Sequence, residues 1–130
     1  MTHLPARADL EPLPDGAPAA GPLYSRAGPF VFVSGVAAGE GADIRAQTAA
    51  TIEALRDILR RAGGDLENLV EVTTYLVSMG DFAGYNDVYS RYFSPEGPAR
   101  TTVAVERLPR PSQLIELRGT AYIATNGSDR

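Results

Sequence analysis

An arginine at position 100 is the first candidate for a ligand-binding side chain. Arg100 follows residues 97–99 (GPA) at the start of a predicted strand, and alternation puts it on one face with Thr102, opposite to Thr101 and Val103. A planar guanidinium held at the start of a rigid strand suits bidentate binding of a small substrate's carboxylate. The residues alone equally allow a solvated surface arginine, which is the commoner fate of a single arginine at a strand end.

A carboxylate stands within the apolar sequence of the last predicted strand. Glu116 is preceded by Leu114 and Ile115 and followed by Leu117, so it is partly removed from water. Desolvation raises the pKa of a carboxyl group and fits it to orient or deprotonate a water molecule. The alternative is an ion pair with Arg118 or with an arginine of a neighbouring strand, because structural ion pairs also perturb acids.

Two further polar residues each have a structural and a functional interpretation. Asn86 lies on the flank of a predicted helix, where a buried amide commonly bonds backbone rather than substrate. Ser34 precedes Gly35 and offers a hydroxyl or a backbone N–H to a ligand, but no base is evident to make it a nucleophile, so a turn role is the alternative. The aromatic residues of the same helix have the spacing of a core stripe: Phe82, Tyr85, Tyr89, Tyr92 and Phe93.

The residue types that are missing exclude several kinds of catalysis. The 130 residues include no cysteine and no tryptophan, all 12 basic residues are arginines, and the one histidine is His3. A thiol nucleophile, a zinc–thiolate site, a Schiff-base lysine and a P-loop lysine are therefore excluded. A single histidine in a proline-rich start also disfavours a Ser-His-Asp triad or a histidine-based metal site.

The charge and hydropathy of the chain argue against two classes of partner. Sixteen acidic and 12 basic residues give a net charge of −4 and a pI near 4.9, which disfavours binding to a nucleic-acid backbone. No apolar run reaches the length of about 18 residues that a membrane span needs, and residues 1–20 lack the basic-then-apolar order of a signal peptide. We therefore expect a cytoplasmic protein that binds neither nucleic acid nor membrane.

The elements that must position these side chains follow from periodicity and turn signals. We expect a proline-rich arm over residues 1–22, a single domain over 23–124 and a polar tail over 125–130. Within the domain, Asp43 is the expected N-cap of the first helix, and Gly63 and Gly64 end it. The predicted order is strand 24–27, strand 30–35, helix 44–62, strand 69–77, helix 81–93, strand 101–106 and strand 114–124. This order predicts an α+β fold, a sheet with two helices.

Two helices cannot cover all the apolar surface of this sheet. On the last strand Glu116, Arg118 and Tyr122 share one face, while the face of Ile115 and Leu117 must meet the helices. The strand 69–77 carries apolar side chains on both faces: Val70, Val72 and Leu76 on one, and Leu69, Tyr75 and Val77 on the other. We therefore predict an obligate oligomer, in which another copy covers the face without helices and Glu116 lies at or near the contact.

Three segments in this order and spacing carry a family resemblance: residues 30–35 (FVFVSG), 81–89 (DFAGYNDVY) and 98–103 (PARTTV), with Leu108 and Pro109 downstream. Together they resemble the Rid family of reactive intermediate deaminases, also called YjgF/YER057c/UK114, over residues 24–124. The resemblance implies a chorismate-mutase-like fold, with a mixed β-sheet covered on one face by two helices. It further implies a homotrimer whose three sites lie in the clefts between subunits.

The resemblance also implies an activity and residue roles. Rid proteins hydrolyse enamines and imines such as 2-aminoacrylate to 2-keto acids and ammonia, so a 2-iminobutanoate/2-iminopropanoate deaminase-like hydrolase without metal or organic cofactor is expected. Carried over by position, Arg100 binds the substrate carboxylate and Glu116 positions the attacking water. Ser34, Tyr24 and Thr102 are expected to contact the substrate, and Asn86 occupies a structural motif position. An iminium carbon is already electrophilic, so its hydrolysis needs only orientation of the substrate, a bound water and charge balance.

The sequence departs from the family pattern at three places. Tyr24 lies closer to Phe30 than the tyrosine of the family's Gly-Pro-Tyr-Ser-Gln-Ala stretch. Val36 replaces a frequent glutamine, and Arg118 stands where a second glutamate often follows Glu116. A cation at position 118 is expected either to favour dianionic or larger substrates or to pair with Glu116.

Three other functions remain open alternatives. The first is a non-catalytic Rid homologue that binds small carboxylic acids or a protein partner. A chorismate-mutase-like catalyst would need more cationic groups than Arg100 and Arg118 supply. Some relatives of this type have been called ribonucleases, but the acidic pI and the lack of a usable histidine oppose that function here.

Overall fold

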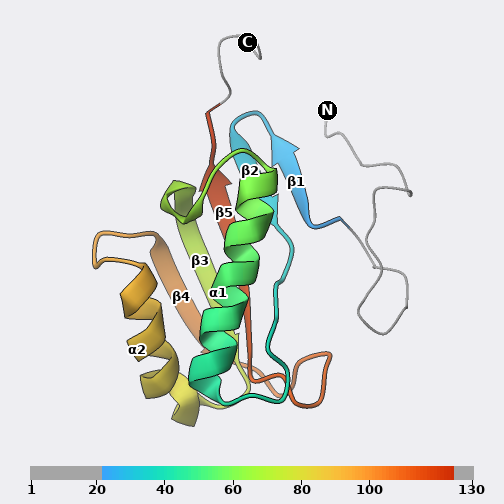
Figure 1. Ribbon diagram of the computed structural model, residues 1–130, viewed down its shortest axis with the longest axis vertical. Coiled ribbons are helices and arrows are strands. Elements are labelled where there is room, and N and C mark those ends of the chain that lie inside the picture. The colour runs from blue at the N-terminus through green and yellow to red at the C-terminus, as the bar shows by residue number, and fades with distance from the viewer. Residues whose placement is uncertain (1–21, 125–130) are drawn as a thin grey trace.

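The computed structural model describes residues 22–124, which form one mixed sheet with two helices on the same face (Figure 1). The strand order is β1-β2-β5-β3-β4, antiparallel throughout except for the parallel pair β3–β4. The predicted arm, apart from Pro22, and the predicted tail lie outside the described residues. The elements are β1 (Tyr24–Ala27), β2 (Phe30–Val33), α1 (Ile44–Arg61), η2 (Leu66–Asn68), β3 (Leu69–Leu76), η3 (Met79–Asp81), α2 (Phe82–Tyr92), β4 (Ala99–Ala104) and β5 (Ile115–Tyr122). The predicted α+β fold is confirmed.

Helix α1 begins and ends where its flanking residues allow. The Asp43 side chain accepts a hydrogen bond from the backbone N–H of Ala46 at 2.8 Å, as an N-cap does. Past the last turn, Gly63 has a φ of +96°, and the N–H groups of Gly63 and Gly64 donate to the carbonyls of Arg60 and Leu59. This pair of bonds is a Schellman motif, which needs the left-handed backbone that glycine adopts without strain.

The crossover between the two parallel strands places α2 above β4. Parallel neighbours cannot be joined by a tight turn, so the chain leaves β3, forms α2 and returns as β4 at the edge of the sheet (Figure 1). Gly84 of α2 lies so close to Ile44 of α1 that a Cβ there would be 2.8 Å from Cγ2 of the isoleucine. The two helices therefore pack tightly side by side over the same face of the sheet.

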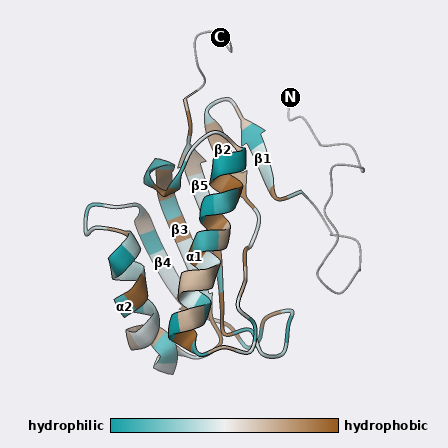
Figure 2. Cartoon of the chain, in the orientation of Figure 1, coloured by the Kyte–Doolittle hydropathy of each residue, from teal (hydrophilic) through white to brown (hydrophobic). Residues whose placement is uncertain are grey.

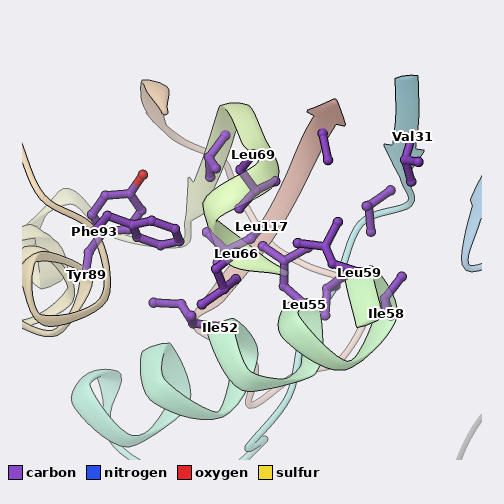
Figure 3. Close-up of a cluster of buried hydrophobic side chains, with 14 of the residues drawn as sticks. Val31, Ile52, Leu55, Ile58, Leu59, Leu66, Leu69, Tyr89, Phe93 and Leu117 are labelled. Carbon is purple, nitrogen blue, oxygen red and sulfur yellow. The ribbon is translucent and has the colours of Figure 1, made fainter. Parts of the chain in front are cut away.

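The hydrophobic core lies between α1 and the sheet, with α2 closing one side. Hydrophobic and hydrophilic residues alternate along both helices, as expected of amphipathic helices packed on a sheet (Figure 2). Side chains of α1 point toward Leu66, Leu69 and Leu117 (Figure 3). Tyr89 of α2 and Phe93, the residue that follows α2, lie beside them. None of the helices in residues 22–124 has the length and apolar character of a membrane span.

A β-bulge changes the face assignment at the start of β3. The pairing of β3 with β5 shifts register between Leu69 and Glu71, so one extra residue lies on the β3 side. Leu69 is consequently buried beneath the helices, whereas Val70 is exposed. The prediction that Val70 shares a face with Val72, and Leu69 with Tyr75, was wrong because strict alternation cannot foresee a bulge.

The strand ends also differ from the sequence prediction. β2 stops at Val33 rather than residue 35, and Val36 then makes an isolated bridge with Leu117. β4 covers Ala99–Ala104 instead of 101–106, so Arg100 is its second residue. Backbone hydrogen bonding to a neighbour decides where a strand ends, and such pairing is not visible in one strand's own pattern.

Candidate active site

Arg100 projects from the edge strand β4 onto the aromatic side of α2. Its Nη1 donates to Oδ1 of Asn86 at 2.7 Å and to the hydroxyl of Tyr85 at 3.4 Å. The guanidinium carbon lies 4.5 Å from the ring centroid of Tyr89, within the range of a cation–π interaction. Nε and Nη2 have no hydrogen-bond partner within residues 22–124, and the residue is exposed. One edge of the guanidinium is thus anchored, and the other is available to a carboxylate.

The register of the parallel strands explains why these groups meet. Val72 pairs with Arg100 and Thr74 with Thr102, so both β4 residues lie on the helix-bearing face. Helical spacing of three and four turns Tyr85, Asn86 and Tyr89 toward the same side of α2. Thr102 is half-buried, with its Oγ1 3.4 Å from the hydroxyl of Tyr85.

Glu116 lies on the opposite face of the sheet, which no helix covers. It pairs across β5 and β3 with Tyr75, and its side chain is half-buried. Burial raises the pKa of Glu116 above the usual value for a glutamic acid. Neither Glu116 nor Arg118 forms an ion pair with any residue in 22–124, so the alternative of a Glu116–Arg118 pair is not realised here.

The segment after β2 holds Ser34 and Gly35 beside Glu116. Val36 and Leu117 exchange two backbone hydrogen bonds of 2.7 and 2.9 Å, which fixes the segment along β5. A Cβ on Gly35 would overlap Oε2 of Glu116, so any other residue there would require the Glu116 side chain to move. The hydroxyl of Ser34 donates to the carbonyl of Pro22 at 2.7 Å, which gives Ser34 a structural contact in addition to its predicted place near the substrate.

Two buried glutamines secure the continuation of this segment. Nε2 of Gln47 donates to the carbonyls of Ala42 and Ser112, at 2.8 and 2.9 Å. Nε2 of Gln113 lies 2.9 Å from Oε1 of Gln47 and 3.0 Å from the carbonyl of Ala38. The connection from β2 to α1 is therefore tied both to α1 and to the loop that precedes β5.

Tyr24 points away from Glu116. It pairs with Val33, which is buried under the helices, and residues directly opposite in an antiparallel pair present their side chains on the same face. Tyr24 packs, half-buried, against the core. Within one chain it therefore belongs to the helix-bearing face.

The predicted site residues thus form two groups on opposite faces of one sheet. Arg100, Thr102 and Asn86 form the first, and Glu116 and Ser34 form the second, with β3 lying between strands β4 and β5. An open groove of about 750 Å³ beside Leu66, Tyr92 and Pro98 includes neither group. Within residues 22–124 there is also no cluster of three or more acidic or histidine side chains able to hold a metal ion.

Sequence reasoning missed the aromatic residues that surround Arg100. Phe82, Tyr85 and Tyr89 have the spacing of a core stripe, and the structure does bury the two tyrosines. The same three rings lie within 6.0 Å of the Arg100 guanidinium carbon. One signal was available in the sequence: Arg100 follows the aromatic helix after a short connection. The β3–α2–β4 crossover then brings the arginine and the aromatic rings together.

Comparisons with known proteins agree on the family. The sequence model of the endoribonuclease L-PSP family matches residues 16–123. A RutC family protein of Pyrococcus abyssi is 45% identical over 109 residues, covering 76% of this chain and 85% of the relative. The 3-aminoacrylate deaminase RutC of Acinetobacter baylyi is 33% identical over 121 residues, covering 85% and 95%.

Solved structures give the same result. A YjgF/YER057c/UK114 family member from Mycobacterium tuberculosis superposes with a TM-score of 0.73 at 30% identity, covering 78% of this chain and 85% of that one. RidA from an Antarctic Psychrobacter superposes with a TM-score of 0.75 at 27% identity, covering 88% and 95%. The resemblance carried by residues 30–35, 81–89 and 98–103 is therefore confirmed, and the chain belongs to the endoribonuclease L-PSP family, which is also that of the YjgF and Rid proteins.

Proposed function

We propose that this protein hydrolyses small enamines and imines that carry a carboxylate, of the 2-aminoacrylate type, to 2-keto acids and ammonia. The observation that carries the proposal is the guanidinium of Arg100, which is anchored by Asn86 and stacked on Tyr89. Its Nε and Nη2 edge has no hydrogen-bond partner among residues 22–124. Such an edge matches a carboxylate in geometry and charge. The similarity to a 3-aminoacrylate deaminase supports the same reaction class.

The carboxyl group of Glu116 acts as the general base and general acid of this reaction. Water adds to the imine carbon, a C–O bond forms, and the C=N electron pair moves to nitrogen while the carboxylate accepts a proton from the water. Glu116 returns this proton to nitrogen, which gives a carbinolamine. The hydroxyl proton of the carbinolamine then moves to nitrogen through Glu116 while the C=O bond forms and the C–N bond breaks, so ammonia departs and a 2-keto acid remains. An enamine is first protonated on carbon to give the imine. Burial raises the pKa of Glu116, which suits a group that must both accept and release a proton.

The site is assembled from two copies of the chain. Arg100 and Glu116 lie on opposite faces of the sheet, so one copy cannot bring both to one small substrate. The face of Glu116 also exposes large apolar side chains: Phe30 and Phe32 are each 42% exposed, and Tyr122 is 48% exposed. A homotrimer in which this face packs against a neighbouring copy buries those rings and brings the Arg100 group of one copy to the Glu116 group of the next.

The test is keto-acid release from imines generated in solution by an amino-acid oxidase or a PLP-dependent lyase. We expect the wild type to accelerate release, Arg100→Ala to abolish the acceleration, and Glu116→Gln to lower kcat. Arg91→Ala is the matched control, because Arg91 is an exposed arginine of α2 that forms an ion pair with Asp87 and has no contact with Arg100 in the described part of the chain. Full activity of Arg100→Ala would overturn the assignment.

A wild type that binds 2-keto acids without accelerating release would instead indicate a binding homologue. In that case Val36→Gln and Arg118→Glu, which restore the residues frequent in the family, are the variants to test for a gain of activity. Cleavage of RNA that is unaffected by Arg100→Ala would favour the ribonuclease function that the family description names.

A further inference from the structure

The hydroxyl of Tyr85 joins α2 to both parallel strands beneath it. Tyr85 is fully buried, and its oxygen lies 2.7 Å from Oγ1 of Thr74 on β3 and 3.4 Å from Oγ1 of Thr102 on β4. Nη1 of Arg100 donates to the same oxygen over 3.4 Å. A single phenol oxygen therefore contacts one buried residue of β3 and the two β4 residues expected to bind substrate.

The hydrogen-bonding capacity of a phenol fits this arrangement. A tyrosine hydroxyl donates one hydrogen bond and accepts two, whereas an arginine only donates. The oxygen of Tyr85 accepts from Arg100, so its own proton goes to one threonine and the other threonine donates to it. The orientations of the Thr102 hydroxyl and of the Arg100 guanidinium are consequently set by the same atom.

The other two tyrosines of α2 show that ring packing alone does not explain this hydroxyl. The hydroxyl of Tyr89 is buried without a hydrogen-bond partner within the described residues, so a ring can pack here with its oxygen unused. The hydroxyl of Tyr92 donates to Glu53 of α1 at 2.9 Å, away from Arg100. Only the hydroxyl of Tyr85 reaches the sheet at the positions of Arg100 and Thr102.

We propose that Tyr85 is a positioning residue for carboxylate binding. Together with Asn86 it holds Nη1 of Arg100, so that the Nε and Nη2 edge faces the substrate, and it aligns the Thr102 hydroxyl beside that edge. This inference rests on the proposed function and deepens it, because it names the group that preorganises the carboxylate-binding arginine. Preorganisation tightens binding since the side chain loses less freedom when the ligand arrives.

The experiment compares Tyr85→Phe with Tyr92→Phe, which removes a hydroxyl from the same helix outside the site. We expect Tyr85→Phe to raise KM for keto-acid release, and the dissociation constant of pyruvate, about three- to tenfold, the effect of losing one modest hydrogen bond to a charged group. We expect kcat to stay within about twofold, because Tyr85 does not touch the reacting carbon. Tyr92→Phe is expected to change neither constant.

A double-mutant cycle separates positioning from a general structural effect. If Tyr85 acts through Arg100, Tyr85→Phe has no further effect on pyruvate binding in an Arg100→Ala background. Equal weakening in both backgrounds, or a fall in kcat with KM unchanged, would overturn the inference. Should Tyr85→Phe not fold, Thr74→Val removes the shortest partner of the hydroxyl and is expected to raise KM in the same direction; an unchanged KM there also counts against the inference.

The same measurements distinguish this inference from the proposed function. Pyruvate binding without turnover refutes the deaminase activity and still reports whether Tyr85 supports Arg100. Turnover with Tyr85→Phe indistinguishable from the wild type refutes the positioning role and leaves the deaminase intact. Absence of both turnover and pyruvate binding refutes both.

Discussion

The carboxylate of Glu116 lies directly against the backbone of Gly35, in the space that a Cβ would occupy. Gly35 is held there by the bridge between Val36 and Leu117, the residue that follows Glu116. The acid and the loop beside it therefore form one unit whose shape depends on the absence of a side chain at position 35.

Gly35→Ala is expected to displace the Glu116 carboxylate and to lower kcat for keto-acid release, with little change in stability, because the colliding atoms are the movable end of a half-buried side chain. Keto-acid release and urea unfolding measure the two effects. Unchanged kcat would show that the carboxylate keeps its position or does not act in the reaction. A large loss of stability would contradict the expectation that the side chain can move aside.

The raised pKa of Glu116 predicts a pH-dependent contribution to stability. A carboxyl group whose pKa is higher in the folded than in the unfolded state favours folding when protonated, and this contribution is lost as the pH rises through the folded-state pKa. We therefore expect Glu116→Gln to be more stable than the wild type at pH 7.5. The difference should disappear below pH 4.5, the usual pKa of a glutamic acid, where both states bind the proton. Urea unfolding at pH 7.5 and 4.0 tests this, and a difference that is independent of pH contradicts it.

Tyr89→Phe is expected to stabilise the protein. Tyr89 is 6% exposed and its hydroxyl has no partner within residues 22–124, while burial raises the pKa of Tyr89 to about 12 and keeps it neutral. Removing a buried unsatisfied hydroxyl should increase the free energy of unfolding by about 1 kcal/mol. Thermal unfolding is the measurement, with Tyr85→Phe as the contrasting variant that should lower the melting temperature. A lower melting temperature for Tyr89→Phe would mean that its hydroxyl has a partner in the assembled protein.

Asn86→Asp is expected to raise KM about tenfold or more. The new carboxylate would lie where Oδ1 of Asn86 now accepts from Nη1 of Arg100 at 2.7 Å, and an ion pair there competes with the substrate's carboxylate for the same cation. Steady-state keto-acid release measures the effect. Asn86→Gln is the neutral comparison, and equal KM values for the two variants would argue that charge at this position is unimportant.

Mixing two impaired variants tests whether each site combines two copies of the chain. Oligomers formed by refolding Arg100→Ala together with Glu116→Gln contain some sites with both wild-type residues if these come from different copies. Such mixtures should release keto acid faster than the sum of the two variants assayed separately. Mixtures that show only this sum, although mass spectrometry shows exchanged subunits, would place both residues in one copy.

Local signals in the sequence were sufficient to predict the fold class and the two ends of α1. Asp43 and Gly63 marked the ends of that helix because caps act within a few residues, and the alternation along β5 gave the face of Glu116 correctly. Leu69 and Val70 were assigned to the wrong faces because a bulge depends on the neighbouring strand. The placement of Arg100 and Glu116 on opposite faces depends on how β4 and β5 each pair with β3, which no local pattern encodes.

The candidate site shows the same division between local and non-local information. The charge and neighbours of Arg100 suggested carboxylate binding, but its contacts with Tyr85, Asn86 and Tyr89 exist only because a crossover helix packs above an edge strand. Gln47 and Gln113 gave no signal, because two polar residues far apart in sequence form a buried pair only after the loops have closed.

The Gln47–Gln113 pair gives the two halves of the site different dynamic character. Its bonds to Ala38, Ala42 and Ser112 join the approach to α1 and the approach to β5 in one network. The segment after Gly35 and the segment before Glu116 therefore lose their freedom together when the domain folds. No ordering of that backbone is left for the moment of substrate binding. Amide protons around Val36 and Leu117 should therefore exchange with solvent only through large-scale unfolding. The backbone of the edge strand β4 should exchange faster, so on that side it is the contacts of the Arg100 side chain with Tyr85 and Asn86 that give order.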